Sequence, residues 1–541
     1  MSKVSRGMSK ARGVCLSIGM VSALIVLGTA QAEEGEPREG HFSAPDVEAF
    51  SATSASTAIP GFYQTSEYMI GRVAVGVILP ESDGTIDAEL NTWSADQRQR
   101  VLAEVRAGLE WWSRQAPQAN LTFVIDDHTT DPIATGYEPI RHPQYEEGLW
   151  IGDVMSRLGY AGGSYWTRVR TYVNDLRERY DTDWAFAIFV VNSAGDTDAA
   201  FADRYFAYAY IGGPFLVMTY NNAGYGIDNM DAVAAHETGH VFRALDQYAS
   251  ANIVCTAKSG YLGVETQNSQ RAGCASNLPS IMRGGIYPYT ANAIDPHARG
   301  QIGWRDSDGD GLFDPVDTTP TFSVDPVTRS DDGWNYAGRV SDAPYPSTWR
   351  PPATINTVWV EYSVDGGGWL PAEPADGRFD SPDEAFALQL RFAVSGNHRV
   401  ELRAHTRFGS VSSPAGFVAV VPDPIDGGLD TWLEPPPAGL PGVTSATSLA
   451  GMASSYLDDG SPAVAIDRVE YRIDGSEWQI AQPQDGAFDG PEEGFVIPLG
   501  LQGGAHQIEA RAIDATGKVE QNFAALQVST GYQAYIPAVQ K

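Results

Sequence analysis

The stretch AHETGHVFRALDQY, residues 235–248, decides how the first half of the chain folds. It places two histidines, His236 and His240, four residues apart with Glu237 between them. On an α-helix these histidines lie about 40° apart, so both side chains project from one face and can bind one metal ion. Two imidazoles beside a carboxylate that takes a proton from water are the groups of a zinc hydrolase. The pattern therefore predicts a helical zinc site with Glu237 as its catalytic base.

A third ligand is predicted at Asp246, which is position 11 when His236 is counted as position 1. The string HETGHVFRALD thereby resembles the metzincin zinc peptidases, and within that clan the snapalysin-like pattern with aspartate at position 11. The resemblance covers about residues 66–304 and implies an α+β zincin catalytic domain. It also implies a catalytic Zn²⁺ held by His236, His240 and Asp246, and protein or peptide substrates.

Arg243 is a departure from that family, which usually has glycine at this position, where the helix ends and the chain turns. If the helix continued, Asp246 would lie about 240° around the axis from His240 and would not reach the same ion. The sequence therefore predicts a turn between residues 242 and 246. A left-handed arginine costs on the order of 1–2 kcal/mol, which metal binding can offset. If the helix runs on instead, Glu265 or another downstream carboxylate is the ligand.

Met282 is a second point of resemblance. It lies in PSIMRGG, residues 279–285, and is similar to the methionine of the turn beneath the zinc in metzincins, with plain core packing as the alternative. The resemblance also implies that FLVMTYN, residues 215–221, is the edge strand that binds an extended peptide. Three tyrosines are candidates to donate to a tetrahedral intermediate, with structural roles as the alternative: Tyr248, Tyr287 and Tyr289.

Strands and helices alternate in the region before the motif. Short apolar runs predict strands, and amphipathic patterns predict helices. The predicted strands are residues 72–79, 121–126, 185–192 and 215–221, and the predicted helices are 95–115 and 163–179. Ser94 and Gln97 form a capping box at the start of the first helix. This order predicts a mixed α/β layer.

Residues 1–32 have the features of a secretory signal peptide: four basic residues precede an apolar run, and Ala30-Gln31-Ala32 closes it. A membrane anchor is the alternative, but the run is short and an acidic segment follows it. Residues 33–65 lack periodicity and are predicted to be a disordered leader or a short pro-segment. After export, Cys255 and Cys274 are expected to pair in an oxidising compartment, with two free thiols as the alternative.

The chain is strongly acidic, with a formal net charge of −32. Cleavage of the signal would take this to −36, because the first 32 residues hold four basic side chains and no acidic ones. Such a surface argues against nucleic acid and anionic membranes as partners. Beyond the signal, no segment is apolar enough to span a bilayer.

The segment DSDGDGLFDPVD, residues 306–317, has the spacing of a calcium loop. Loop positions 1, 3, 5, 7, 9 and 12 are Asp306, Asp308, Asp310, Leu312 (through its carbonyl), Asp314 and Asp317. Because Pro315 follows and aspartate ends the loop, it resembles a thrombospondin type 3 or dockerin-like loop more than a signalling EF-hand. The sequence predicts a structural Ca²⁺ in the linker 305–320, with a merely acidic linker as the alternative.

An internal repeat occupies the rest of the chain. VEYSVDGGGW, starting at 360, matches VEYRIDGSEW, starting at 469, and DGRFDSPDEAF, starting at 376, matches DGAFDGPEEGF, starting at 485. Alternating apolar residues and turn dipeptides predict two immunoglobulin-like or fibronectin III-like sandwiches. They are expected at residues 321–422 and 429–530, before a tail at 531–541.

The predicted protein is thus a multidomain, secreted zinc endopeptidase: an α+β catalytic domain, a calcium linker and two all-β sandwich domains. The sandwiches are candidates to bind glycans or surface ligands. The alternative is a non-catalytic extracellular binding or adhesion protein on the same scaffold, against which the intact Glu237 speaks because binding alone needs no base. Hydrolysis of a non-peptide amide, as in a cell-wall polymer, is also compatible with the sequence.

Overall fold

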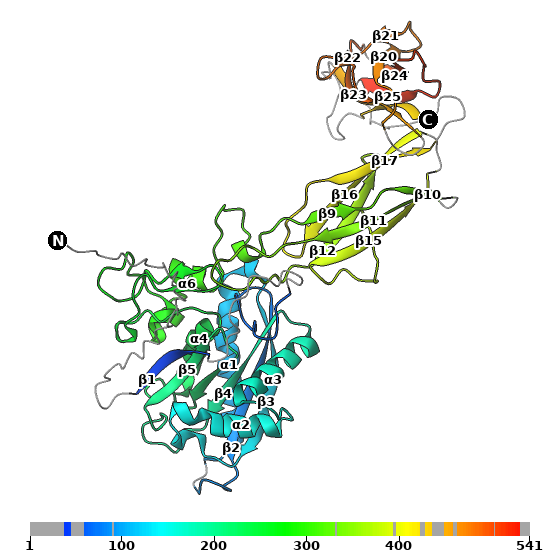
Figure 1. Cartoon of the computed structure of the whole chain (residues 1–541). Coiled ribbons are helices and arrows are strands. Elements are labelled where there is room, and N and C mark those ends of the chain that lie inside the picture. Colours follow the sequence, from blue (N-terminus) through cyan, green and yellow to red (C-terminus); the bar gives the residue numbers. More distant parts are fainter. Residues whose placement is uncertain are drawn as a thin grey trace, which may run out of the picture.

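The computed structural model describes residues 37–44, 59–88, 91–330, 333–392, 396–421, 428–434, 448–457, 462–501 and 504–530. Figure 1 shows three domains that follow one another along the chain. The predicted signal peptide, the C-terminal tail and most of the leader lie outside the described residues. Among the described helices, none combines the length and the apolar composition that a membrane crossing requires.

The N-terminal domain is built on a six-stranded sheet with the order β1-β5-β6-β4-β2-β3. Its strands are β1 (Arg38–Ser43), β2 (Arg72–Ser82), β3 (Thr122–Thr135), β4 (Trp184–Val191), β5 (Tyr205–Ile211) and β6 (Phe215–Thr219). Neighbours are parallel except for β5 and β6, which are antiparallel. Every residue of β4 is buried, as expected for a parallel strand covered on both faces.

Helices cover both faces of this sheet (Figure 1). They are α1 (Ala95–Gln115), α2 (Glu147–Arg157), α3 (Tyr165–Tyr180), α4 (Met230–Val241), α5 (Ile286–Thr290) and α6 (Pro296–Gln301). Short 3-10 turns are η1 (Pro117–Ala119), η2 (Pro139–Arg141), η3 (Gln144–Glu146), η4 (Ile227–Asn229), η5 (Ala249–Ala251), η6 (Ile281–Arg283) and η7 (Asp314–Val316). The capping box at Ser94 and Gln97 is confirmed. Helices α1 and α4 share one apolar core, and α2 and α3 share the other.

Two features of the sheet differ from the predictions. The run 215–221 contains β6, which lies inside the sheet between β5 and β4, so its prediction as the peptide-binding edge strand is wrong. The edge position on this side is taken by β1, which pairs with the outer side of β5. Residues 38–43 are therefore an ordered strand, although the sequence around them predicts a disordered leader or a pro-segment. The backbone pairing with β5 supplies the order that the local composition lacks.

Each half of the C-terminal repeat folds as two packed sheets around its own apolar core. The first module has the sheets β10-β11-β15-β14, with β9 on β11, and β13-β12-β16-β17. Its strands are β9 (Thr321–Val324), β10 (Thr328–Ser330), β11 (Gly333–Ser341), β12 (Val358–Val364), β13 (Leu370–Pro371), β14 (Glu373–Pro374), β15 (Asp383–Leu390), β16 (Gly396–Thr406) and β17 (Ala415–Val421).

The second module repeats this arrangement with the sheets β18-β19-β23-β22 and β21-β20-β24-β25. Its strands are β18 (Gly428–Leu433), β19 (Ser448–Tyr456), β20 (Ile466–Ile473), β21 (Gln479–Ile480), β22 (Gln482–Pro483), β23 (Glu492–Pro498), β24 (Gly504–Asp514) and β25 (Ala524–Thr530). The matching sequences VEYSV and VEYRI lie in β12 of one module and in β20 of the other. The chain is thus multidomain, with two β-sandwich modules after the mixed domain.

The loop between β11 and β12, residues 342–357, reaches back onto the N-terminal domain. Arg350 from this loop forms a two-pronged ion pair with the fully buried Glu67 of the N-terminal domain, at 2.9 and 3.0 Å. Tyr261 of the N-terminal domain makes two hydrogen bonds to this loop. Its hydroxyl donates to the backbone carbonyl of Tyr345 at 2.7 Å, and its own carbonyl accepts from Ser347 Oγ at 2.7 Å. The first sandwich is therefore docked by buried polar contacts.

Glu147 at the start of α2 gives the N-terminal domain a pH-dependent contribution to stability. Burial raises the pKa of Glu147 to about 7, although hydroxyls including Tyr210 and Tyr165, at 2.6 and 2.9 Å, oppose the shift. Because the folded pKa lies above the unfolded one, this contribution is full below about pH 4.5 and is lost as pH rises through about 7. We expect the free energy of unfolding of Glu147→Gln to exceed that of the native chain by roughly 3 kcal/mol at pH 8, and to differ little from it at pH 4. Denaturant unfolding at both pH values measures this, and an equal difference at both would contradict it.

Candidate metal centre

Three side chains converge at the C-terminal end of α4. Nε2 of His236 and Nε2 of His240 lie 3.1 Å apart, and Oδ1 of Asp246 lies 3.1 Å from each of them. All three residues are buried, with His240 fully so. A tetrahedral Zn²⁺ with bonds of about 2.0–2.1 Å separates its ligand atoms by about 3.3 Å. The triangle therefore has the size that such an ion needs.

The imidazoles are oriented so that their lone pairs meet in this triangle. Nδ1 of His236 contacts the carbonyl of Ile281 at 2.9 Å, and Nδ1 of His240 contacts the carbonyl of Ala244 at 2.7 Å. A carbonyl only accepts, so each neutral ring carries its hydrogen on Nδ1 and presents a bare Nε2. Three acceptor atoms then face one another without a hydrogen between them. That arrangement is unfavourable unless a cation lies among them, so the residues fit a divalent metal.

The electrostatics of the pocket also favour a cation. Burial lowers the pKa of His236, but the carboxylates of Glu39 and Asp246 outweigh it and raise that pKa to about 10. Burial alone would raise the pKa of Asp246, yet the neighbouring His240 and His41 hold it well below its usual range. Burial lowers the pKa of His240 to about 4, which keeps this ring neutral. Without a metal, His236 therefore holds a second proton while His240 stays neutral, and a divalent cation would replace that proton beside the carboxylates.

The predicted turn after the helix is present. Helix α4 ends at Val241, and Arg243 has φ 76°, in the left-handed region. Its guanidinium donates to Glu67 Oε1 at 2.8 Å and occupies space that a side chain on Gly212 would fill. This ion pair accounts for arginine at a position that favours glycine, because it offsets the backbone cost of about 1–2 kcal/mol. Asp246 returns to the helix as a result.

Glu237 is fully buried beside the triangle, and neither of its carboxylate oxygens has a hydrogen-bond partner among the described residues. Burial raises its pKa well above the usual range, while His236 opposes the shift. An unpaired buried carboxylate costs free energy, so its retention points to a ligand or a reaction rather than to packing. When it is ionised, Glu237 is a proton acceptor that lies next to the three atoms of the triangle.

Met282 lies directly beneath the helix that carries the two histidines. A Cβ atom on Gly239 would come within 2.6 Å of Met282 Sδ, so only glycine allows this contact. The neighbouring Ile281 supplies the carbonyl that orients His236. The turn η6 therefore packs against the helix that carries the two histidines and orients one of them.

The strand β1 brings two further side chains to the centre. Nδ1 of His41 lies 2.6 Å from Oδ2 of Asp246, and His41 has a ring nitrogen within 4.8 Å of ligand atoms of His240 and Asp246. Glu39 has a carboxylate oxygen within 4.8 Å of ligand atoms of both His236 and Glu237. Sequence reasoning missed both residues because it treated residues 33–65 as unstructured. The alternation Glu39-Gly40-His41, in a chain with only nine histidines, is the signal that would have found them.

Of the candidate tyrosines, only Tyr248 contacts the predicted ligands, since its hydroxyl donates to Asp246 Oδ2 at 3.0 Å. Tyr287 is exposed and Tyr289 stacks on Trp111. Tyr225, which the sequence did not single out, accepts from the Gly285 amide at 2.9 Å. Burial and the nearby Glu39 raise the pKa of Tyr225 to about 12, so its hydroxyl stays protonated.

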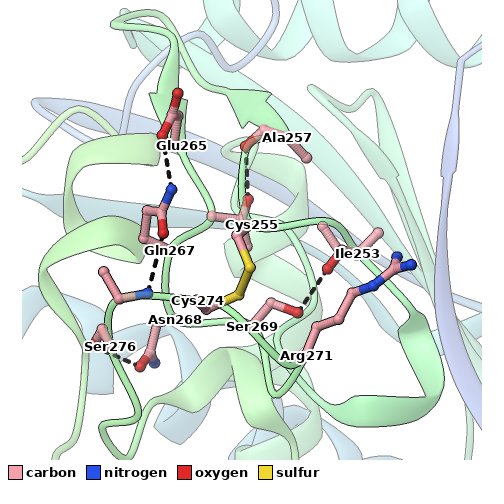
Figure 2. Close-up of a disulfide and its surroundings, with 12 residues drawn as sticks. Ile253, Cys255, Ala257, Glu265, Gln267, Asn268, Ser269, Arg271, Cys274 and Ser276 are labelled. Carbon is pink, nitrogen blue, oxygen red and sulfur yellow. Dashed lines mark hydrogen bonds between the residues drawn. A yellow bond between two sulfur atoms is a disulfide. The ribbon is translucent and has the colours of Figure 1, made fainter.

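The region between Asp246 and Met282 is irregular and is held by a disulfide (Figure 2). The predicted pairing of Cys255 with Cys274 is confirmed. Only the short strands β7 (Lys258–Ser259) and β8 (Val264–Glu265) pair within it. Figure 2 shows that Glu265, the alternative third ligand, is instead bound by Gln267 Nε2, at 2.9 Å. Closing a loop of this length stabilises the fold by about 3 kcal/mol.

The acidic linker forms a turn in which several aspartate carboxylates lie close together. Asp306, Asp308 and Asp310 each place a carboxylate oxygen within 4.8 Å of the others, and Asp306 accepts from the amides of Gly309 and Gly311. Burial and the neighbouring aspartates raise the pKa of Asp317. The Leu312 amide donates to Asp310 at 2.8 Å. Asp314 is the exception, because it is buried and bound by Arg305 and Ser307, at 2.6 and 2.8 Å.

No family model matches this sequence, and no curated protein matches it either. Similar solved structures include the sulfane dehydrogenase SoxCD from Paracoccus pantotrophus, with 10% identity and a TM-score of 0.16, covering 33% of this chain and 72% of that one. The fibronectin(III)-like modules of Clostridium thermocellum CbhA have 13% identity, a TM-score of 0.14 and coverage of 39% and 94%. The chicken CNTN1 FN1–FN3 domains have 11% identity, a TM-score of 0.14 and coverage of 39% and 66%.

Proposed function

We propose that this chain is a secreted, zinc-dependent endopeptidase with a metzincin-like catalytic domain. The observation that carries the proposal is the triangle of His236, His240 and Asp246 with the unpaired carboxylate of Glu237 beside it. A purely structural zinc site is closed by four protein ligands and needs no base next to it. An extracellular location is supported by the disulfide, which persists in oxidising compartments.

In the proposed reaction, Glu237 accepts the proton of the attacking water and passes it to the leaving amine. A zinc ion held by the three ligands would supply Lewis acidity, polarising the scissile carbonyl and acidifying water. Tyr225 is the group we assign to donate a hydrogen bond to the carbonyl oxygen as negative charge develops there. Asp246 is kept in position by Tyr248, which donates to its outer oxygen.

The proposed substrate is an extended peptide bound along the outer edge of β5. This edge offers backbone groups to a strand, and β1 already uses them. A cavity of about 700 Å³ lies beside Tyr225 and is lined in part by Phe206, Ala223 and Ile286. We assign this cavity to an apolar or aromatic side chain of the substrate.

The test of this proposal uses residues 33–541, expressed in an oxidising compartment. We expect one zinc per chain, much weaker zinc binding in His240→Ala, and cleavage of an unfolded protein that stops on chelation and returns with zinc. Absence of bound zinc would refute the proposal. Bound zinc without hydrolysis, in the native chain and also in the double variant Glu39→Ala/His41→Ala, would favour an extracellular binding protein.

We further propose that the linker binds a structural Ca²⁺ through Asp306, Asp308, Asp310 and Asp317, which carry closely spaced carboxylates. A calcium ion would neutralise this repulsion and stiffen the junction between the domains. We expect calcium to slow proteolytic cutting near residue 310 at least tenfold in the native chain and not in Asp308→Asn. Electrophoresis of digests with calcium or a chelator measures this, and equal cutting rates in both would contradict it.

A further inference from the structure

Two buried polar side chains lie at the base of loop 342–357, the docking loop that joins the first sandwich to the N-terminal domain. Asp342 is the first residue of this loop and Asn356 is its last residue but one, with exposed fractions of 3% and 1%. The side-chain amide of Asn356 donates to Oδ2 of Asp342 at 2.9 Å. It also donates to the Val316 carbonyl at 3.1 Å, and the Thr318 hydroxyl donates to Asp342 Oδ2 at 2.7 Å. The base of the docking loop is thereby bound to the end of the linker.

Each of these two side chains keeps one oxygen without a partner. Oδ1 of Asp342 and Oδ1 of Asn356 are both buried, and neither accepts a hydrogen bond from the described residues. Burial raises the pKa of Asp342, and the hydrogen bonds from Thr318 and Asn356 oppose the shift. Among the described residues, no cationic side chain forms an ion pair with this carboxylate. A buried carboxylate without a counter-charge costs free energy, so the cluster lacks one positive charge.

The second sandwich offers a comparison within the chain. The backbone amide of Asp342 donates to the carbonyl of Pro382 at 2.8 Å, and that of Ser455 donates to Pro491, the counterpart of Pro382 in the repeat, also at 2.8 Å. Ser455 therefore holds in the second module the place that Asp342 holds in the first. The sandwich fold itself does not require a carboxylate at this position. Its presence in the module that carries the docking loop points to a role at the junction.

We propose that Asp342 and Asn356 bind a calcium ion through these two oxygens, and that the ion holds the two ends of the docking loop together. A carboxylate and an amide carbonyl are ligands of hard cations, and the cluster offers no imidazole or thiolate that would favour zinc or copper. Calcium suits a buried site better than magnesium, because magnesium gives up its bound water reluctantly. This ion is separate from the one proposed for the linker loop, whose ligands end at Asp317, and it does not depend on zinc.

The test measures calcium binding to residues 33–541 in four forms: the native chain, Asp342→Asn, Asp308→Asn and Thr318→Val. We expect two calcium ions per native chain and one in Asp342→Asn, whose amide has the size of the carboxylate but not its charge. Asp308→Asn should keep the junction ion. Thr318→Val is the matched control, because Thr318 lies in the same cluster but supplies no proposed ligand, and it should bind two ions. Equilibrium dialysis against millimolar calcium, the range in which extracellular modules bind it, gives the stoichiometry.

A second readout is the melting temperature of the first sandwich. Without calcium, Asp342→Asn should melt at least as high as the native chain, because it buries no charge. With saturating calcium the order should reverse, because only the native chain gains the stability that the junction ion supplies. An order that calcium does not change would overturn the inference, as would two ions per chain in Asp342→Asn.

The two calcium proposals fail separately. One ion per native chain that Asp342→Asn retains would overturn the junction site and leave the linker site intact. One ion that is lost in Asp342→Asn and kept in Asp308→Asn would support the junction site and refute the linker site. No calcium in any form would overturn both.

Discussion

Glu237→Gln should lower kcat for protein cleavage by a factor of 10² to 10⁴ while the zinc content stays at one per chain. The amide is nearly the same size as the carboxylate, so the buried space beside the ligand triangle stays filled. It cannot accept a proton from water at neutral pH, and the step that needs a base is lost. KM should change little, because Glu237 contributes to the reaction rather than to holding the peptide.

The measurement is steady-state cleavage of an unfolded protein together with metal analysis of each purified form. It is made in the native chain and again on the background of the Glu39→Ala/His41→Ala variant, so that a blocked site is not mistaken for an inactive one. Glu265→Gln is the matched control, because Glu265 is bound by Gln267 in the disulfide-held region. A Glu237→Gln chain that keeps its zinc and retains more than about a tenth of the activity would rule out this residue as the base.

The second large effect is expected at Glu67, which is buried between two arginines. It accepts from Arg243 at 2.8 Å and from Arg350 at 2.9 and 3.0 Å. Burial alone would raise the pKa of Glu67, but the two guanidiniums hold it below its usual value. Glu67→Gln removes the negative charge and leaves both cations buried together. Breaking a buried ion pair in this way costs about 3–5 kcal/mol. We therefore expect the free energy of unfolding of the N-terminal domain to fall by that amount.

The same change should weaken zinc binding, because Arg243 forms the turn that returns Asp246 to the helix. Asp183→Asn is the control: Asp183 pairs with Arg407 across the same domain junction, at 2.7 Å, but does not contact the turn. We expect the free energy of unfolding of this control to fall by about 1 kcal/mol and its zinc affinity to match that of the native chain. Denaturant unfolding and zinc titration measure both effects. Zinc affinity unchanged in Glu67→Gln would show that the turn forms without its ion pair.

The local part of the site could be predicted from the sequence, and the part that depends on distant contacts could not. The positions of His236, His240 and Glu237 follow from helical geometry within one turn and a half. Asp246 could be named, but the reason that Arg243 tolerates its conformation is Glu67, which lies 176 residues away in the chain. No local sequence pattern predicts such a partner, because a buried glutamate cannot be distinguished in the sequence from an acidic residue on the surface.

The sheet shows the same limit. The fully buried strand β4 was predicted, since continuous apolar runs of this length mark central parallel strands. Strand β5, YFAYAYI, was missed, and so was its position between β6 and the edge strand β1. Which strand becomes an edge is decided by pairing order, which a sequence pattern does not encode. Strand β1 was missed for a related reason, because its order comes from β5 rather than from its own composition.

Arg350 makes the turn that carries Asp246 depend on a residue of the next domain. It belongs by sequence to the first sandwich, on the loop between β11 and β12, yet its guanidinium completes the charge balance beneath the turn that carries Asp246. A fragment cut at the end of the mixed domain would keep every predicted zinc ligand and still lose this support. Because the loop that carries Arg350 joins strands of both sheets of the first sandwich, the smallest unit that keeps this support extends through the whole of that sandwich, to Val421.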